Sequence, residues 1–446
     1  MNKTRFGRLN WTVLMIFGLI GQIAWSVENM YFNLFVFETV APSLDTVTLM
    51  VQLSGIAATV TTLIIGTLSD KVGNRRSFIS YGYIIWGVTV ALFGYLSPEL
   101  TASVLGTDIA RAVTITLTLV VIGDCVMTFF GSSANDACFN AWVTDNTDSE
   151  YRGSVEGVLS ILPLIAMLIV AGGFGILVEA IGYRYLFLAL GIVISLSGVL
   201  GVFLIKDSAS LVGNGTLKDI FYGFKPSVIK SNAPLYLALI IVMLYGVACQ
   251  TFMPYLIIYM KTYLGFSVIE YSLVFGICIV AGALINLYLT RLSDRVDKSL
   301  MLYIAIGVFT VGLLLMYIFN SGDNIALLIT FGLGGFIMIT GYILVSALCG
   351  SMVRDYTPAN SVGKLQGVRM VFSVLIPMIV GPMIGNAINK ARNIPLPDLG
   401  SADAMTTEYI PAPEIFLAGA IVSAVMIAIV PLLRKKIKEV NNEAKN

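Results

Sequence analysis

The fold is decided by the stretch GTLSDKVGNRR at residues 66–76, a short polar link that follows one long apolar run and precedes another. Its centre returns after a later apolar run, where residues 292–296 read LSDRV. A second link also recurs, because residues 143–157 align with residues 353–367 without a gap, at an offset of 210. The same links therefore occur in both halves of the chain, which predicts two similar helical bundles arranged as parallel repeats.

The composition is that of a protein surrounded by lipid. Of the 446 residues, 57% are hydrophobic and 12% are charged, and the mean hydropathy is +0.88. Soluble domains carry about 25% charged residues, and about 20 apolar residues span a bilayer as a helix. The chain is long enough for about a dozen such spans. The net charge of +1, with no long basic block, predicts no nucleic-acid partner.

The apolar runs predict an all-α polytopic membrane protein with twelve transmembrane helices in two pseudo-symmetric six-helix bundles. We place the N-terminal bundle at 1–205, a cytoplasmic central loop at 206–233, the C-terminal bundle at 234–434 and a cytoplasmic tail at 435–446. The runs fall near 11–37, 46–67, 77–97, 113–141, 154–178, 182–205, 234–260, 268–290, 299–319, 324–350, 364–389 and 413–433.

The distribution of basic residues predicts the orientation. With both termini in the cytoplasm, most of the 27 Lys and Arg residues fall on the cytoplasmic side, as the positive-inside rule requires. An odd number of spans would put the two tails on opposite sides and remove this asymmetry. We expect a multi-pass protein of the cytoplasmic membrane that acts as a monomer in the lipid bilayer.

The link at residues 66–76 resembles the signature between spans 2 and 3 of the major facilitator superfamily, Gly-x-Leu-x-Asp-Arg-x-Gly-Arg-Arg. Lys71 and Asn74 replace the commonest basic residues of that signature. Residues 182–187 also resemble a Gly-Trp-Arg segment that often opens span 6 in this superfamily. The resemblance covers the whole chain, and it implies a secondary transporter that alternates access by rocking two halves about a solute.

Charged residues of the repeated links are candidates for a cytoplasmic gate. A carboxylate beside a helix N-terminus is stabilised by about 0.3–2 kcal/mol. We therefore predict that Asp70 latches onto the start of span 11 and Asp294 onto the start of span 5. The alternative is that these charges only set the orientation of the loops. The predicted gate comprises Asp70, Arg75, Arg152, Asp294, Arg295 and Asp355.

Three acids inside apolar runs are candidates for ion or proton coupling. Glu28 lies in the outer half of span 1, Asp124 near the middle of span 4 and Asp136 in the inner part of span 4. An ionisable group in lipid costs several kcal/mol, so it usually faces a water-filled passage or a partner. Span 4 contains no Lys or Arg, and the chain has no histidine. At about 100° per residue, Asp124 and Asp136 need not share a helix face. The alternative is a polar brace between helices.

Polar and aromatic residues near these acids are candidates for solute binding. Sugars offer hydroxyls for hydrogen bonds and apolar ring faces for stacking, so a sugar or glycoside is the favoured solute. Trp25, Glu28 and Asn29 share a predicted face of span 1. The predicted substrate-binding residues are Trp25, Glu28, Asn29, Asn135, Gln250, Tyr255 and Asn286.

A second resemblance narrows the expected coupling. Asp136, shortly before Ala141-Trp142-Val143, is similar in position to the span 4 acid of the glycoside–pentoside–hexuronide:cation symporters and the related sucrose carriers. The clustered span 2 acids of the sodium–melibiose type are missing, and span 2 offers only Gln52 and hydroxyls. We expect proton- or cation-coupled symport, with a proton at least as favoured as sodium. The alternative is drug or metabolite efflux by proton antiport.

Other function classes are disfavoured. There is no Gly-x-x-x-x-Gly-Lys-Ser/Thr loop for ATP. Without histidine, a Ser or Cys nucleophile lacks its usual base, so we do not expect an enzyme. The five cysteines share no metal-ligand spacing. We expect no metal site and no cofactor beyond a proton or sodium as the coupling ion.

Overall fold

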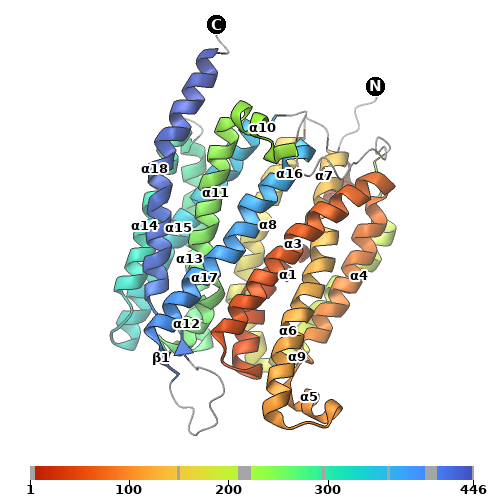
Figure 1. The fold of residues 1–446 in the computed structure, drawn as a ribbon, viewed down its shortest axis with the longest axis vertical. Coiled ribbons are helices and arrows are strands. Elements are labelled where there is room, and N and C mark those ends of the chain that lie inside the picture. The colour runs from red at the N-terminus through yellow and green to blue at the C-terminus, as the bar shows by residue number, and fades with distance from the viewer. Residues whose placement is uncertain are drawn as a thin grey trace. The chain divides into compact units, whose positions relative to one another are not determined.

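The computed structural model describes residues 6–147, 151–208, 222–293, 297–358, 362–396 and 409–443. These residues are almost entirely helical (Figure 1). The contacts between Cα atoms divide the chain into two compact units, Met1–Leu217 and Lys218–Asn446. Each unit is described by itself below.

In the first unit, α4 packs along α9, α1 along α8 and α3 along α6, and Figure 1 shows α1, α3, α4 and α6 in red to orange. Several spans contain π-helical segments, here labelled η. The segments are α1 (Arg8–Val27), η1 (Glu28–Phe32), α2 (Asn33–Phe35), η2 (Val36–Val40), α3 (Leu44–Val72), α4 (Arg75–Phe93), α5 (Pro98–Leu105), α6 (Ile109–Gly131), η3 (Ser132–Phe139), α7 (Asn140–Asn146), α8 (Arg152–Ile169), η4 (Val170–Phe174) and α9 (Gly175–Leu204).

In the second unit, α14 packs between α15 and α18, and α11 contacts α17 and α18. A two-stranded antiparallel ladder pairs Ile394 with Ile410. The segments are α10 (Pro226–Ser231), α11 (Ala233–Phe252), the 3-10 turn η6 (Met253–Tyr255), α12 (Leu256–Thr262), α13 (Val268–Ser293), α14 (Lys298–Ile318), α15 (Asn324–Tyr356), α16 (Val362–Met370), the π-helical η7 (Val371–Leu375), α17 (Ile376–Arg392), β1 (Ile394–Pro395), β2 (Tyr409–Ile410) and α18 (Glu414–Glu443).

The described residues contain eleven continuous helices that are long and apolar enough to cross a membrane. One of them, Gly157–Leu204, has 48 residues, which is about 72 Å at 1.5 Å per residue against a hydrocarbon core of about 30 Å. It breaks at Gly182, whose φ of 77° and ψ of 161° are not helical. A residue with a side chain rarely adopts a positive φ. This break divides the segment into the two predicted spans, and the twelve-helix fold class is confirmed.

The link at residues 66–76 turns the chain within two residues. Gly73 ends α3 in the left-handed conformation, with φ of 67°, where a glycine has no Cβ penalty. The side chain of Asn74 then caps α4, accepting a hydrogen bond from the backbone N–H of Ser77 at 2.9 Å. The sequence of the link therefore explains why two long helices meet in a tight corner.

Some helix boundaries differ from the prediction. The predicted tail at 435–446 is helical as far as Glu443, because α18 continues through a run of good helix formers with Lys436 and Glu439 paired at 2.6 Å. The predicted loop at 206–233 contains the short helix α10. Span 7 is interrupted at Pro254, where a 3-10 turn separates α11 from α12.

Candidate functional site

Glu28 is buried at the start of the π-helical segment η1. Its side chain is 7% exposed, and its Oε1 accepts a hydrogen bond from the hydroxyl of Thr128 on α6 at 3.0 Å. Its Oε2 is buried and has no hydrogen-bond partner among the described residues. One oxygen of the Glu28 carboxyl is therefore satisfied by the protein and the other is left open.

Asp124 on α6 lies in the same environment and is 1% exposed. Its carboxyl interacts with the hydroxyl of Ser54 on α3 and electrostatically with Glu28. Its Oδ1 is also buried, again without a hydrogen-bond partner in the part of the chain that the structure describes. Burying a polar oxygen without a hydrogen bond costs about 1–3 kcal/mol in proteins.

Asp136 is the accessible member of the three acids. It lies in η3 and is only half-buried. Its Oδ2 accepts a hydrogen bond from the hydroxyl of Ser132 at 3.0 Å. The indole of Trp25 lies nearby, and its buried N–H has no hydrogen-bond partner among the described residues. Asp136 interacts electrostatically with Glu28 as well, so Glu28 interacts with both aspartates.

The structure therefore brings the two aspartates of span 4 toward one partner, although a count of 100° per residue does not put them on one face. The count assumes an α-helix, and residues 132–139 form a π-helix, whose hydrogen bonds run from i to i+5. Π-helical turns are frequent at functional sites. None of the three acids takes part in the ion pairs found among the described residues.

A column of aromatic rings in the first unit positions Trp25. The rings of Trp25 and Trp86 lie 5.0 Å apart, those of Trp86 and Tyr83 5.4 Å, and those of Tyr83 and Phe17 4.9 Å. Gly131 sits against the first two rings. A Cβ on Gly131 would lie 2.7 Å from Trp86 and 2.9 Å from Trp25, closer than such atoms pack. The absence of a side chain at Gly131 therefore allows the Trp25 indole to lie beside Asp136.

Gly131→Ala is expected to displace the Trp25 ring and to lower the apparent affinity for solute at least about tenfold, which is about 1.4 kcal/mol. Overpacking of a tight contact also destabilises by about 1–3 kcal/mol. The measurement is solute binding together with the thermal midpoint of the purified protein. Gly157→Ala is a matched control, because a Cβ there meets nothing within 4 Å. Equal affinity in both variants would contradict the positioning of Trp25 by Gly131.

Two of the predicted solute-binding residues of the first unit lie in different surroundings. Asn135 is 2% exposed, and its amide nitrogen donates to the hydroxyl of Tyr83 at 2.5 Å and to the carbonyl of Phe17 at 3.5 Å. It joins α1, α4 and η3 as a brace. Asn29 is exposed, and its amide donates to the carbonyl of Trp25 at 2.8 Å. Glu28 turns inward instead, so the shared face predicted for span 1 is not formed.

In the second unit, two of the predicted residues are committed to packing. Tyr255 is fully buried and its hydroxyl donates to the carbonyl of Pro382 at 3.0 Å. Asn286 is 4% exposed, and its amide donates to the carbonyls of Gly282 and Thr340 at 2.8 and 3.0 Å. Both side chains therefore tie one helix to another. Gln250 is half-buried on α11.

Sequence reasoning missed Tyr342, a half-buried residue of α15. Its ring lies 5.6 Å from that of Tyr245, whose hydroxyl donates to the backbone carbonyl of Tyr342 at 2.9 Å. Tyr342 stands in an apolar run with no charged neighbour in sequence, so no local pattern singled it out. Only the packing of α11 against α15 brings the two tyrosines together.

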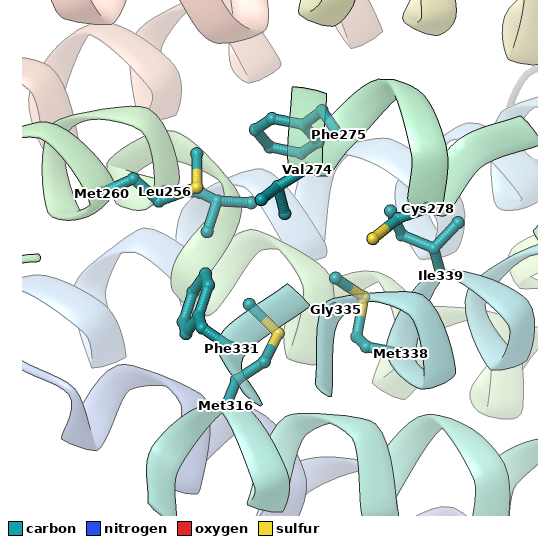
Figure 2. Close-up of a pocket in the computed structure, with 10 residues that line it drawn as sticks. All are labelled: Leu256, Met260, Val274, Phe275, Cys278, Met316, Phe331, Gly335, Met338 and Ile339. Carbon is teal, nitrogen blue, oxygen red and sulfur yellow. The ribbon is translucent and has the colours of Figure 1, made fainter. Parts of the chain in front are cut away.

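The second unit also encloses a small apolar cavity, which Figure 2 shows with sulfur atoms of three methionines and a cysteine around it. Its volume is about 10 Å³, room for a single water at most, and water needs polar partners to stay in such a place. It is a packing defect and too small for an organic solute. The lining residues are Leu256, Met260, Val274, Phe275, Cys278, Met316, Phe331, Gly335, Met338 and Ile339.

The repeated links carry ion pairs within each unit. The Arg75 side chain is 4% exposed. It forms a close ion pair with Asp70 and a second ion pair with Asp145 at 3.1 Å. In the second unit, Lys298 pairs with Asp355 at 2.6 Å. Asp355 is the counterpart of Asp145 at the offset of 210 residues. Each unit thus joins the start of one helix to the end of the next with a cation and an acid, and neither Asp145 nor Lys298 was among the predicted gate residues.

The predicted latches stay predictions. Asp294 and Arg295 lie outside the described residues, as does the side chain of Arg152. Asp70 forms an ion pair with Arg75 of its own unit.

Asp297, just before α14, pairs with Arg434 at 2.9 Å. Burial acts to raise the pKa of Asp297, but hydrogen bonds from the backbone of Ser299 and from Arg434 outweigh it and lower that pKa.

The comparisons with known proteins agree on one family. The sequence model described as Major Facilitator Superfamily matches residues 14–382. A mutant of the nucleoside transporter NupG has a TM-score of 0.65 and 14% identity over 95% of this chain and 99% of that chain. A bacterial homologue of the lysosomal transporter Spinster, inward-facing and unoccupied, has a TM-score of 0.61 and 14% identity over 96% and 97%.

A third similar structure is a bacterial homologue of the iron transporter ferroportin, in an outward-facing state with soaked iron. It has a TM-score of 0.60 and 15% identity over 95% of this chain and 98% of that chain. Identities of 14–15% show a common fold and leave the solute open. No curated protein matches this chain by sequence.

Proposed function

Because this chain belongs to the Major Facilitator Superfamily and is a membrane transporter, we propose that it is a symporter. Its solute is a small polar organic molecule, a sugar or glycoside, which it moves together with a proton or another cation. The two units alternate access to the solute across the cytoplasmic membrane, with both termini in the cytoplasm. The chain works as a monomer and uses no cofactor other than the coupling ion.

The observation that carries this proposal is the cluster of Glu28, Asp124 and Asp136 in the first unit. Glu28 interacts electrostatically with both aspartates, and no ion pair among the described residues compensates the three carboxyls. Uncompensated carboxylates repel one another and lose hydration on burial. Such a cluster is stable only when protons or a cation neutralise part of its charge. Reversible neutralisation is what a gradient-driven carrier requires.

The solute-binding residues that fit this proposal are the ones with accessible surface. Trp25 and Asp136 lie together in the first unit, with the exposed Asn29 one turn from Trp25. Gln250 and Tyr342 are half-buried in the second unit. Indole and phenol rings stack on the apolar faces of a sugar, while the carboxyl and the amides bind its hydroxyls.

The test is solute uptake by the purified protein in proteoliposomes. The panel comprises labelled sugars, glycosides, nucleosides and carboxylates, each tested under an inward proton gradient, an inward sodium gradient and no gradient. We expect concentrative uptake of a sugar or glycoside under one imposed gradient. Uptake of none of the four classes, in vesicles in which a control transporter works, would overturn the proposal.

The same vesicles separate symport from the alternative of efflux by proton antiport. Symport accumulates solute when the lumen is less acidic than the bath. Antiport accumulates it when the lumen is more acidic than the bath, because each solute then exchanges for a proton moving outward. Accumulation in the acid-loaded vesicles alone would replace the symport proposal by the efflux one.

A further inference from the structure

A short helix at one end of the first unit leaves large apolar side chains uncovered. The helix, α5 (Pro98–Leu105), lies between α4 and α6 in the sequence, and Figure 1 shows it in orange beside the end of α6. Leu100 is 47% exposed, Val104 72% and Leu105 56%. Large apolar groups that are exposed together mark a surface for a protein or membrane partner. The exposure of α5 therefore points to a partner outside the described residues.

The residues of α5 divide into three faces. Thr101 is buried against the rest of the unit. Leu100 and Val104 share an apolar face, because residues at i and i+4 lie on one side of a helix. By the same spacing Glu99 and Ser103, both exposed, share a polar face. An apolar face beside a polar one is typical of a helix that lies in the interface between membrane and water.

A buried hydrogen bond fixes the level of α5 along the span that follows it. The hydroxyl of Thr116 on α6 donates to the hydroxyl of Thr101 at 2.7 Å. Thr116 lies about two turns after Ile109, the first residue of α6, which is about 10 Å along a helix. The helix that α6 begins is long and apolar enough to cross a membrane. The α5 helix therefore lies beside the first turns of a span, where that span enters the bilayer, rather than beyond its end.

Arg111 places a positive charge at the same end of α6. It is exposed and takes part in none of the ion pairs found in the part of the chain that the structure describes. An arginine lays its apolar stem along a lipid surface while its charged head stays in the polar layer. A guanidinium group also binds a phosphate through two parallel hydrogen bonds. The phosphate of a phospholipid therefore complements the charge of Arg111 at this level.

We propose that α5 docks on the phospholipid surface of the membrane. Its face of Leu100 and Val104 enters the boundary between headgroups and acyl chains, and Arg111 binds lipid phosphates beside it. In the proposed orientation this is the outer surface, because α4 runs from the link at residues 66–76 to the opposite end of the unit. Since α5 is bonded to α6, the docking holds this span at a fixed level in the bilayer. The docking involves lipid alone and does not depend on which solute the protein carries.

The size of α5 favours lipid over a second copy of the chain. Its 8 residues span about 12 Å at 1.5 Å per residue, whereas a specific interface between proteins buries at least about 1,000 Å² in total. A single helix of this length offers only part of that area. A lipid surface sets no such minimum, because it surrounds every span of the protein.

The test is the accessibility of nitroxide spin labels in the full-length protein in phospholipid vesicles. Leu100→Cys and Val104→Cys carry the label on the apolar face, and Glu99→Cys and Ser103→Cys carry it on the polar face as matched controls. All four are made with Cys125→Ser, because Cys125 is half-buried and the other four native cysteines are buried. Oxygen concentrates in the bilayer and a nickel chelate in water. We expect the ratio of oxygen to nickel collisions to be several-fold higher at residues 100 and 104 than at residues 99 and 103.

Two other outcomes would overturn the docking. Frequent nickel collisions at all four positions would place α5 in water. Few collisions with either reagent at residues 100 and 104 would show that protein covers this face, from a second copy or from another part of the chain. Two labelled positions on each face keep the comparison possible if one variant does not fold.

Arg111→Gln tests the phosphate contact with the spin label kept at residue 104. Loss of the guanidinium group should bring the label closer to water and lower its ratio of oxygen to nickel collisions several-fold. Arg111→Lys keeps the positive charge and should retain most of the ratio. An unchanged ratio in Arg111→Gln would overturn the phosphate contact.

Discussion

Asp136→Asn is expected to abolish proton-driven accumulation of the solute while exchange of labelled for unlabelled solute continues. One pH unit corresponds to about 1.4 kcal/mol per proton, so a carrier that moves one proton with each solute concentrates it about tenfold per pH unit. An amide at residue 136 has nearly the same shape as the protonated acid but cannot take up or release a proton by titration. The accumulation ratio should therefore fall from about ten to about one.

The measurement compares accumulation and exchange in the same proteoliposomes. Exchange requires only the solute site and the alternation of access, so its persistence shows that the variant folds and binds. Ser133→Ala is a suitable control, because the Ser133 hydroxyl donates to the carbonyl of Phe129 at 2.6 Å and leaves Asp136 untouched. An accumulation ratio in Asp136→Asn equal to that of the wild-type protein would remove Asp136 from the coupling.

Arg75→Gln is expected to destabilise the first unit by about 2–3 kcal/mol. The Arg75 side chain is 4% exposed and is shared by Asp70 and Asp145, whose side chains are 46% and 25% exposed. Removing one partner of a buried pair costs about 3–5 kcal/mol, because it leaves the other charge uncompensated. The exposure of the two acids to solvent reduces that figure. The free energy of unfolding is measured by denaturant titration in detergent.

The second unit supplies the matched control for this ion pair. Lys298 and Asp355 occupy the corresponding place, but their side chains are 39% and 47% exposed. Exposed pairs contribute about 0.2–1 kcal/mol, so Lys298→Gln should change the free energy of unfolding by less than 1 kcal/mol. Similar losses in Arg75→Gln and Lys298→Gln would contradict the role of burial. Adding Asp145→Asn to Arg75→Gln should restore part of the loss, since it removes one uncompensated charge.

The similar structures include a nucleoside transporter and a homologue of an iron transporter, which illustrates how the fold and the site contribute separately. Their chain traces match that of this protein with TM-scores of 0.60–0.65. A fold of this kind provides two bundles that can alternate access, while the side chains inside select the solute. For this chain, we propose that the side chains that select the solute lie around Trp25 and Asp136.

Several features followed from local sequence because their physical causes are local. The spans are set by runs of apolar residues, and each run must satisfy its own backbone hydrogen bonds as a helix in lipid. The tight corner at residues 73 and 74 follows from a glycine that ends one helix and an asparagine that caps the next. Even the break inside the 48-residue helix fell where Gly182 was expected to begin a span.

The interpretation of individual polar residues was less successful. Asn135, Tyr255 and Asn286 look in sequence like groups available to a solute, but each is buried and donates to a partner on another helix. A buried amide or hydroxyl needs such a partner, and the partner is far away in the chain. For the same reason the buried Arg75 was predicted as a gate residue without its partner Asp145.

The sequence by itself determined that this protein is a twelve-span membrane protein with two similar halves. It also showed a few acids that no neighbouring base neutralises. These features follow from the sequence because hydrophobicity and charge are properties of each segment. Only the tertiary structure decided that Glu28 interacts with both Asp124 and Asp136, and that Asp136 is the most accessible of the three acids. That outcome depends on how far each helix is rotated about its axis. The π-helical turns at Glu28–Phe32 and Ser132–Phe139 change this rotation, and a regular 3.6-residue period does not contain it.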